Sequence, residues 1–143
     1  MRAFRLVAVL VVVLGTASLT ISCGKDSQTT TSPTTTPTSP TTSTFVSRLT
    51  VKGAVSRSFT ATQAGTVSVT LTNAGGPFTL VGLGLGVPTT GIARCALNTA
   101  ISTTPGASPQ ITAAVDAGSY CVTIYDLGNL TETIDFSLTV VFP

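Results

Sequence analysis

The chain has 143 residues, no histidine, and a formal net charge of +2 from seven basic and five acidic side chains. The missing histidine excludes Ser-His and Cys-His catalysis and removes the commonest metal ligand. Charged residues make up only 8% of the chain, against roughly 25% in an ordinary globular domain, so Thr, Ser and Asn must supply the polar surface.

Residues 1–22 have the layout of a secretory leader. Arg2 and Arg5 precede an almost purely apolar run of sixteen residues, 6–21. As a helix this run reaches about 24 Å at about 1.5 Å per residue, which is short for a bilayer core of about 30 Å and suits a signal peptide. Loss of both arginines with the leader would leave a neutral chain, without the basic field that attracts nucleic acid.

The leader ends in the sequence LTISC, residues 19–23, which resembles the bacterial lipoprotein box. In that family the cysteine thiol is alkylated with a diacylglyceryl group, the leader is cut away, and the new amino terminus is often acylated, for example with palmitate. The resemblance implies lipid on Cys23 and, because Gly24 rather than Asp follows, the outer membrane of a two-membrane cell. An ordinary cleaved signal and an uncleaved anchor helix are the alternatives.

Residues 23–44 predict a disordered tether. From position 27 onward the segment is almost only Thr, Ser and Pro, which offers nothing to bury against the entropy of ordering. Extended, it reaches roughly 60 Å at about 3.1 Å per residue. We expect a stalk or a plain solvated spacer, and the same composition could carry O-linked sugars.

Residues 45–143 predict one all-β domain, because their apolar residues recur with a period of two. Phe45, Leu49 and Val51 share one face of the first strand, and later strands alternate in the same way. The expected strands number about eight, which favours an antiparallel β-sandwich. They cover residues 45–51, 55–60, 66–73, 78–85, 91–97, 109–115, 119–125 and 131–142.

Three glycines, Gly82, Gly84 and Gly86, interrupt the fourth of these strands. A phosphate-binding loop would need a helix directly after them, and Pro88 in a β context argues against one. Glycine inside a strand more often marks a bulge or a close approach of backbone.

The sequence VDAGSYCV, residues 115–122, follows an aliphatic strand and resembles the bacterial pre-peptidase C-terminal domain. The sequence FTA at 59–61 before GTV at 65–67, and the alternating run 134–142, fit the same pattern. The resemblance covers roughly residues 55–142. It implies a jelly-roll-like, non-catalytic accessory module of secreted proteins, some of which bind calcium or matrix polymers.

Cys95 and Cys121 remain once the lipidated cysteine is set aside. An even pair in an oxidising compartment favours a disulfide, which would close about 26 residues and stabilise the fold by about 3–4 kcal/mol in the chain-entropy model. Separate free thiols and a redox dithiol are the alternatives, the latter without a Cys-x-x-Cys spacing.

The carboxylates predict neither a metal site nor a catalytic pair. Asp126 with Asn129 or Glu132 is the nearest approach to a calcium loop, but calcium wants six to eight oxygens, and an Asx-turn at Asp126 is the simpler interpretation. Asp116 and Asp126 both fall at strand ends, which does not suggest the facing acids of glycoside hydrolysis. We expect no catalytic residue and no cofactor.

These features predict a lipid-anchored, extracytoplasmic, non-catalytic binding or envelope-structural module whose partner is a protein or a glycan. The alternatives are an accessory subunit that docks on a separate secreted enzyme and a glycan-binding module. Tyr125 and Asp126 are the candidate ligand contacts, with Phe45 as a further aromatic, since exposed aromatic faces stack on apolar surfaces. A large exposed apolar face would favour protein docking instead.

Overall fold

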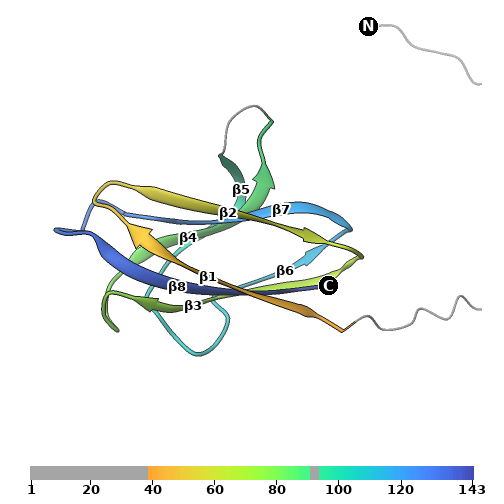
Figure 1. Ribbon diagram of the computed structural model, residues 1–143, viewed down its shortest axis with the longest axis horizontal. Coiled ribbons are helices and arrows are strands. Elements are labelled where there is room, and N and C mark those ends of the chain that lie inside the picture. Colours follow the sequence, from red (N-terminus) through yellow and green to blue (C-terminus); the bar gives the residue numbers. More distant parts are fainter. Residues whose placement is uncertain (1–38, 91–93) are drawn as a thin grey trace, which may run out of the picture. The chain divides into compact units, whose positions relative to one another are not determined.

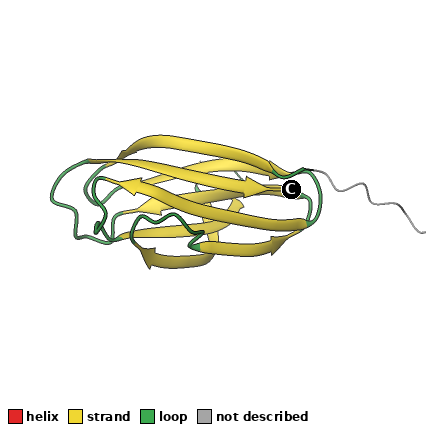
Figure 2. Cartoon of the chain, turned by 90° about the horizontal axis from the view of Figure 1, so that it is seen from below, coloured by secondary structure: helices red, strands yellow, loops and turns green. Residues whose placement is uncertain are grey.

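The computed structural model describes residues 39–90 and 94–143. Within those ranges it contains eight strands and no helix (Figure 1, Figure 2). The strands are β1 (Thr41–Leu49), β2 (Ala54–Ala61), β3 (Gly65–Ala74), β4 (Val81–Pro88), β5 (Cys95–Thr103), β6 (Ile111–Val115), β7 (Gly118–Tyr125) and β8 (Ile134–Phe142). The expected signal helix and most of the expected tether lie outside the described residues.

Two four-stranded antiparallel sheets form the domain. Sheet A has the order β1-β8-β3-β6, and sheet B has the order β2-β7-β4-β5. The pairs β1–β8, β2–β7, β3–β6 and β4–β5 are nested, like one long hairpin folded over on itself. Additional pairing of β8 with β3 and of β7 with β4 completes the two sheets. This is jelly-roll connectivity, so the predicted antiparallel, jelly-roll-like sandwich is confirmed.

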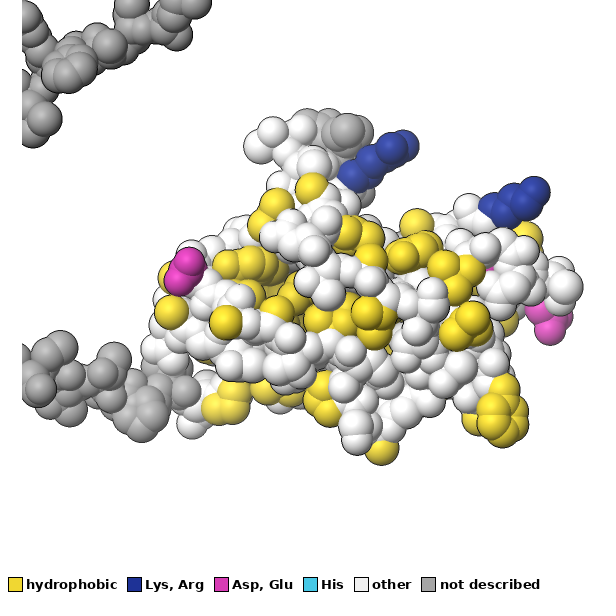
Figure 3. Space-filling model, turned by 180° about the vertical axis from the view of Figure 1, so that it is seen from behind, with side chains coloured by type: hydrophobic (Ala, Val, Ile, Leu, Met, Phe, Trp, Pro, Cys, Tyr) yellow, Lys and Arg dark blue, Asp and Glu magenta, His cyan; other side chains and the backbone are white. Residues whose placement is uncertain are grey.

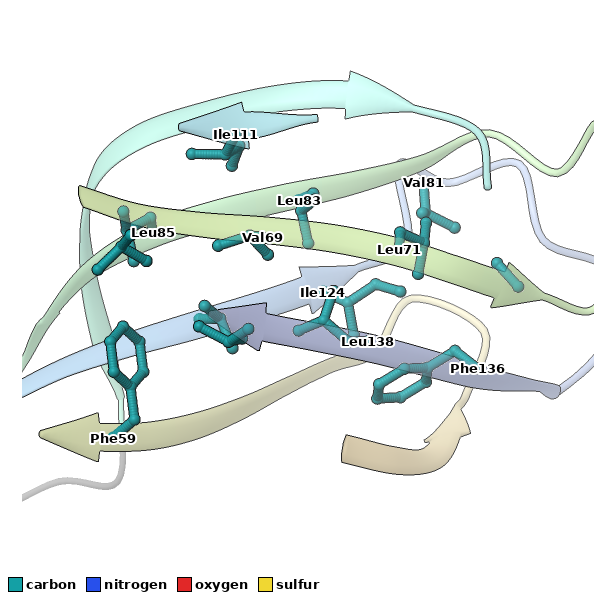
Figure 4. Close-up of a cluster of buried hydrophobic side chains, with 14 of the residues drawn as sticks. Phe59, Val69, Leu71, Val81, Leu83, Leu85, Ile111, Ile124, Phe136 and Leu138 are labelled. Carbon is teal, nitrogen blue, oxygen red and sulfur yellow. The ribbon is translucent and has the colours of Figure 1, made fainter. Parts of the chain in front are cut away.

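The core lies between the sheets, and strict alternation decides which side chains enter it. On β3, Val69 and Leu71 are fully buried, while Thr70 between them is directed to the outer face. β8 continues this pattern in register, with Val140 beside Val69 and Leu138 beside Leu71. Sheet B supplies the opposing layer, which includes Phe59, Leu83 and Ile124 (Figure 4).

The ends of β1 differ from the prediction. Thr41 already pairs with Phe142, so the strand begins four residues before the predicted start at Phe45, inside the segment 23–44 predicted as tether. β-branched threonine suits a strand, and β8 provides the partner. The prediction that Val51 faces the core is wrong, because Val51 lies in the turn after β1 and is 42% exposed. Lys52 in the same turn has a φ of 56°, which a continuing strand does not allow.

The bounds of two strands in sheet B also differ from the prediction. β4 begins at Val81 rather than Phe78, and β5 covers 95–103 rather than 91–97. β5 lies at the edge of its sheet, and most of its side chains are exposed, so it carries no apolar alternation that would locate it. Its pairing with β4 extends to Thr103 opposite Val81, which shortens the predicted loop 102–108 at its start.

The sandwich has two different ends (Figure 1). The described chain enters at one of them, where Thr41 lies beside Phe142 and the backbone N–H of Thr62 donates to the carbonyl of Pro143. The opposite end carries the loops that follow β1, β3 and β7, which are residues 50–53, 75–80 and 126–133. We call these three loops the tip.

Candidate functional site

Cys95 and Cys121 form a disulfide, as the sequence predicts. Cys95 begins β5 and Cys121 lies on β7, although β4 separates these strands within sheet B. Strands two places apart in a sheet are separated by about 9.5 Å, whereas the two Cα atoms are 5.8 Å apart. The start of β5 therefore leaves the plane of the sheet and passes over β4.

Gly86 is the residue that permits this crossing. It pairs with Cys121 on one side and Leu97 on the other, next to an irregularity in the β4–β5 register. A methyl group on Gly86 would overlap the backbone carbonyl of Ala96. The prediction that glycine in this strand marks a bulge or a close approach of backbone is confirmed at Gly86.

The two aromatic residues singled out from the sequence lie on different surfaces. Tyr125 is half-buried on the outer face of sheet B, where its ring covers Gly82 and occupies the space of a missing side chain. Phe45 on β1 is partly buried and packs against the core. The fold therefore does not assemble these two residues into one aromatic platform. Cys23, the predicted lipid attachment residue, lies outside the described residues.

Asp126 organises the tip through hydrogen bonds to backbone. One carboxylate oxygen accepts the N–H of Lys52 at 2.6 Å, and the other accepts those of Gly128, Asn129 and Leu130 at 2.8, 3.1 and 3.2 Å. The bond from Lys52 contributes most to lowering the pKa of this carboxyl below the usual aspartate range; desolvation opposes it, and the other three bonds add to it. The Asx-turn predicted at Asp126 is present.

These bonds connect all three loops of the tip. Asp126 joins the β7–β8 loop to the β1–β2 turn, and its own N–H donates to the carbonyl of Gly53 at 2.9 Å. Asn129 then donates its side-chain amide to the carbonyl of Leu80 at 3.0 Å, which joins the β3–β4 loop. The tip is therefore a pre-organised surface rather than three independent loops.

The tip displays apolar side chains to solvent (Figure 3). Phe78 is 91% exposed, and Val51, Leu80 and Leu127 are each about 42–43% exposed. Isolated exposed apolar residues are normal, but a fully exposed phenylalanine that lines one hollow with Leu80, at an end of the domain that exposes two further apolar side chains, marks a candidate contact surface.

Phe78 is not among the predicted contact residues, because the apolar run 78–85 predicts a strand that starts at this residue. That prediction is wrong, since Phe78 lies in the loop before β4. The available signal was Gly75-Gly76-Pro77 directly before it, a turn sequence that can continue past the proline. The positive φ of 70° at Gly75 shows that the turn needs that glycine.

A shallow hollow of about 310 Å³ lies beside Phe78. Its walls come from the β3–β4 loop, the β7–β8 loop and the start of β8. Asn129, Thr131 and Glu132 contribute polar groups, while Leu80 and Ile134 contribute apolar surface. Glu132 is the only charged residue that lines it, so the hollow is acidic.

No group of three or more Cys, His, Asp or Glu side chains gathers within residues 39–90 and 94–143. Asp126 directs both of its oxygens to backbone N–H groups. No helix in the described part of the chain is long and apolar enough to cross a membrane.

The sequence matches no protein-family model, and no curated protein matches it either. The solved structures that resemble the fold include the following two. A periplasmic inhibitor of g-type lysozyme from Aeromonas hydrophila, PliG, has a TM-score of 0.51 and 15% identity, with 70% of this chain and 85% of that chain covered. The Yersinia pseudotuberculosis-derived mitogen has a TM-score of 0.51 and 16% identity, with 73% and 87% covered. At these identities the likeness concerns the fold alone.

Proposed function

We propose that this protein is a non-catalytic binding module, held by lipid on Cys23 in a bacterial envelope and directed at a protein partner through its tip. The observation that carries the proposal is the placement of the pre-organised apolar tip at the end of the sandwich opposite to the entry of the chain. A tethered domain of this kind presents its contact surface away from its own attachment.

The anchor follows from the sequence around Cys23. Each buried CH₂ of a lipid chain contributes about 0.8 kcal/mol, and two or more chains anchor a protein stably without a membrane-spanning segment. Gly24 after the cysteine favours the outer membrane in a two-membrane cell, with the domain facing the periplasm or the exterior. The disulfide supports an oxidising compartment.

A protein partner is favoured over a glycan. Phe45 and Tyr125 lie on different surfaces and do not form a stacking platform, whereas four of the seven exposed large apolar residues, including Phe78, lie in the three loops of the tip. The sequence resemblance to pre-peptidase C-terminal domains suggests, as the alternative form of this proposal, an accessory role beside a separate secreted enzyme. PliG, which shares the fold, inhibits an enzyme in the periplasm, so this kind of sandwich is compatible with binding another protein.

Expression of the full chain in a bacterium that processes lipoproteins tests the anchor. We expect intact-mass measurement to give a chain that starts at Cys23 and carries added lipid, recovered with membranes. The Cys23→Ser variant should retain its leader and lack lipid. An unmodified mature chain starting elsewhere, released into the soluble fraction, would remove the anchor from this account.

A further inference from the structure

We propose that the tip is a docking surface in which Phe78 enters an apolar pocket of the partner protein while a basic side chain of that partner occupies the acidic hollow beside Glu132. This inference rests on the proposed function and specifies it, because it names the contact surface and the chemistry of the partner. The recognised feature is an apolar pocket flanked by lysine or arginine.

Phe78 is held in place by the loop that presents it. The N–H of Gly75 donates to the carbonyl of Asp135 at 2.9 Å, and that of Thr79 donates to the carbonyl of Gly76 at 3.3 Å. Asn129 anchors the far side of the loop through Leu80. Little loop entropy is therefore lost on binding. A rigidly presented, exposed aromatic side chain is the type of residue that dominates the energetics of protein interfaces.

The hollow beside Phe78 determines the charge of the partner. Glu132 is exposed and is the only charged residue lining it. Across residues 39–90 and 94–143 the structure has one ion pair, between Arg48 and Asp135, so Glu132 is not engaged by a cation of its own domain. A guanidinium or ammonium group of the partner in the hollow would pair with Glu132 and would donate further hydrogen bonds to the side-chain oxygens of Asn129 and Thr131.

The same charges argue against a bilayer as the occupant of the tip. The tip carries one cationic side chain, Lys52, and two carboxylates, Asp126 and Glu132. Surfaces that bind anionic bilayers gain about 1 kcal/mol from each Lys or Arg near the lipid and place several on the polar side of an apolar face. Protein docking is therefore the interpretation that the tip supports.

The docking surface is tested by comparing three forms of the full lipid-bearing chain in detergent. These are the wild type, Phe78→Ser and Val46→Ser. Val46 is the matched control, because it is apolar, 72% exposed and located on β1 outside the tip. Each form is used to capture proteins from detergent extracts of the source cells. The protein captured by wild type is then identified, purified and titrated directly against each variant by calorimetry, and unchanged thermal unfolding confirms that the variants are folded.

We expect Phe78→Ser to raise the Kd for the purified partner by about thirtyfold or more, which is the effect of removing an interface hot spot. Val46→Ser should change the Kd less than twofold. Glu132→Gln should weaken binding at low salt and flatten its salt dependence. If Phe78→Ser binds as tightly as wild type, Phe78 and the tip are not the contact surface, and only the lipid-anchored binding module of the proposed function stands. If wild type captures no protein, the tip inference and the binding function both fail.

A second experiment, with vesicles, distinguishes docking of the tip on a protein from insertion of the tip into lipid. An environment-sensitive fluorophore is attached to Leu127→Cys, and the full chain is reconstituted into phosphatidylethanolamine and phosphatidylglycerol vesicles. We expect the emission maximum to be the same as that of the labelled chain measured without vesicles and without the partner. A blue shift that disappears with Phe78→Ser would show insertion into lipid and would overturn the inference.

Discussion

Asp126 accepts the backbone N–H of Lys52 at 2.6 Å across two loops that lie 74 residues apart in the sequence. This bond fixes the turn after β1 to the loop after β7, and through Asn129 it also fixes the loop that presents Phe78. One carboxylate thus determines the geometry of the surface that we assign to binding.

The first prediction concerns acid sensitivity. Backbone hydrogen bonds hold the pKa of Asp126 below its unfolded value, so its ionised form stabilises the fold at neutral pH. That contribution is present above the unfolded pKa and is lost as pH falls through the lower, folded pKa. We expect wild type to lose unfolding free energy as pH drops below about 4, and Asp126→Asn to be less stable at pH 7 with a flatter acid limb.

Denaturant titrations between pH 7 and pH 2 measure this effect. Asp116→Asn is the control, because it removes an exposed carboxylate from the β6–β7 turn and should keep the wild-type acid limb. An Asp126→Asn protein as stable as wild type at pH 7, with the same acid limb, would show that Asp126 does not hold the tip.

The second prediction concerns the crossing of β5 over β4. Gly86→Ala places a methyl group against the carbonyl of Ala96, which is backbone and cannot move aside easily. We expect a loss of about 1–3 kcal/mol in unfolding free energy, typical of an overpacked site, together with slower or incomplete disulfide formation. Chemical denaturation and thiol quantification measure the two effects.

Gly118→Ala is the matched control for Gly86→Ala. Gly118 also lies in a strand of sheet B, but an added Cβ would meet only Tyr120 at 3.8 Å, an ordinary contact. It should change stability by less than about 0.5 kcal/mol. Equal stability of the two alanine variants would contradict the close approach at Gly86.

The third prediction concerns the disulfide itself. Cys95 and Cys121 close a segment with a sequence separation of 26, for which the chain-entropy model gives about 3–4 kcal/mol. We expect the double variant Cys95→Ala/Cys121→Ala, or the reduced protein, to lose about that much unfolding free energy. Guanidinium titrations with and without reductant provide the comparison. An unchanged midpoint on reduction would mean that the bridge does not constrain the unfolded chain.

The fourth prediction concerns Gln110, which continues the edge of sheet A where β6 has not yet begun. Its side-chain amide accepts from the N–H of Leu71 at 2.7 Å and donates to the carbonyl of Leu71 at 3.3 Å. Gln110→Leu leaves the N–H of Leu71 without this partner, while the carbonyl of Leu71 still accepts the N–H of Gly106 at 2.9 Å. We expect a loss of about 1–3 kcal/mol in unfolding free energy for the unsatisfied donor. The unfolding free energy of Gln110→Glu should fall between those of wild type and Gln110→Leu, because a carboxylate can accept the N–H of Leu71 but cannot donate to its carbonyl. A fully stable Gln110→Leu protein would show that water replaces the amide.

Much of the fold could be predicted because the central strands alternate strictly. Val69 and Leu71 on β3, and Leu138 and Val140 on β8, follow the period of two that a sheet with one buried face imposes. The disulfide was predictable from cysteine count and compartment. The tip was not, because a pattern of periodicity contains no information on which loops meet in space.

Phe78 illustrates the limit most clearly. Its neighbours Leu80 and Val81 make it look like the start of an apolar strand, yet β4 begins only at Val81. The partners that hold its loop, Asp135 and Asn129, come from about 50 to 60 residues later in the chain. Long-range hydrogen bonds of this kind override a local strand pattern.

Hydrogen exchange of the full chain, with and without its purified partner, shows whether the tip is the surface that binds. We expect slower exchange on binding within residues 50–53, 75–80 and 126–133, and unchanged exchange along β1, β5 and β6. Protection along those edge strands, with the tip exchanging as fast as in the free protein, would contradict binding through the tip.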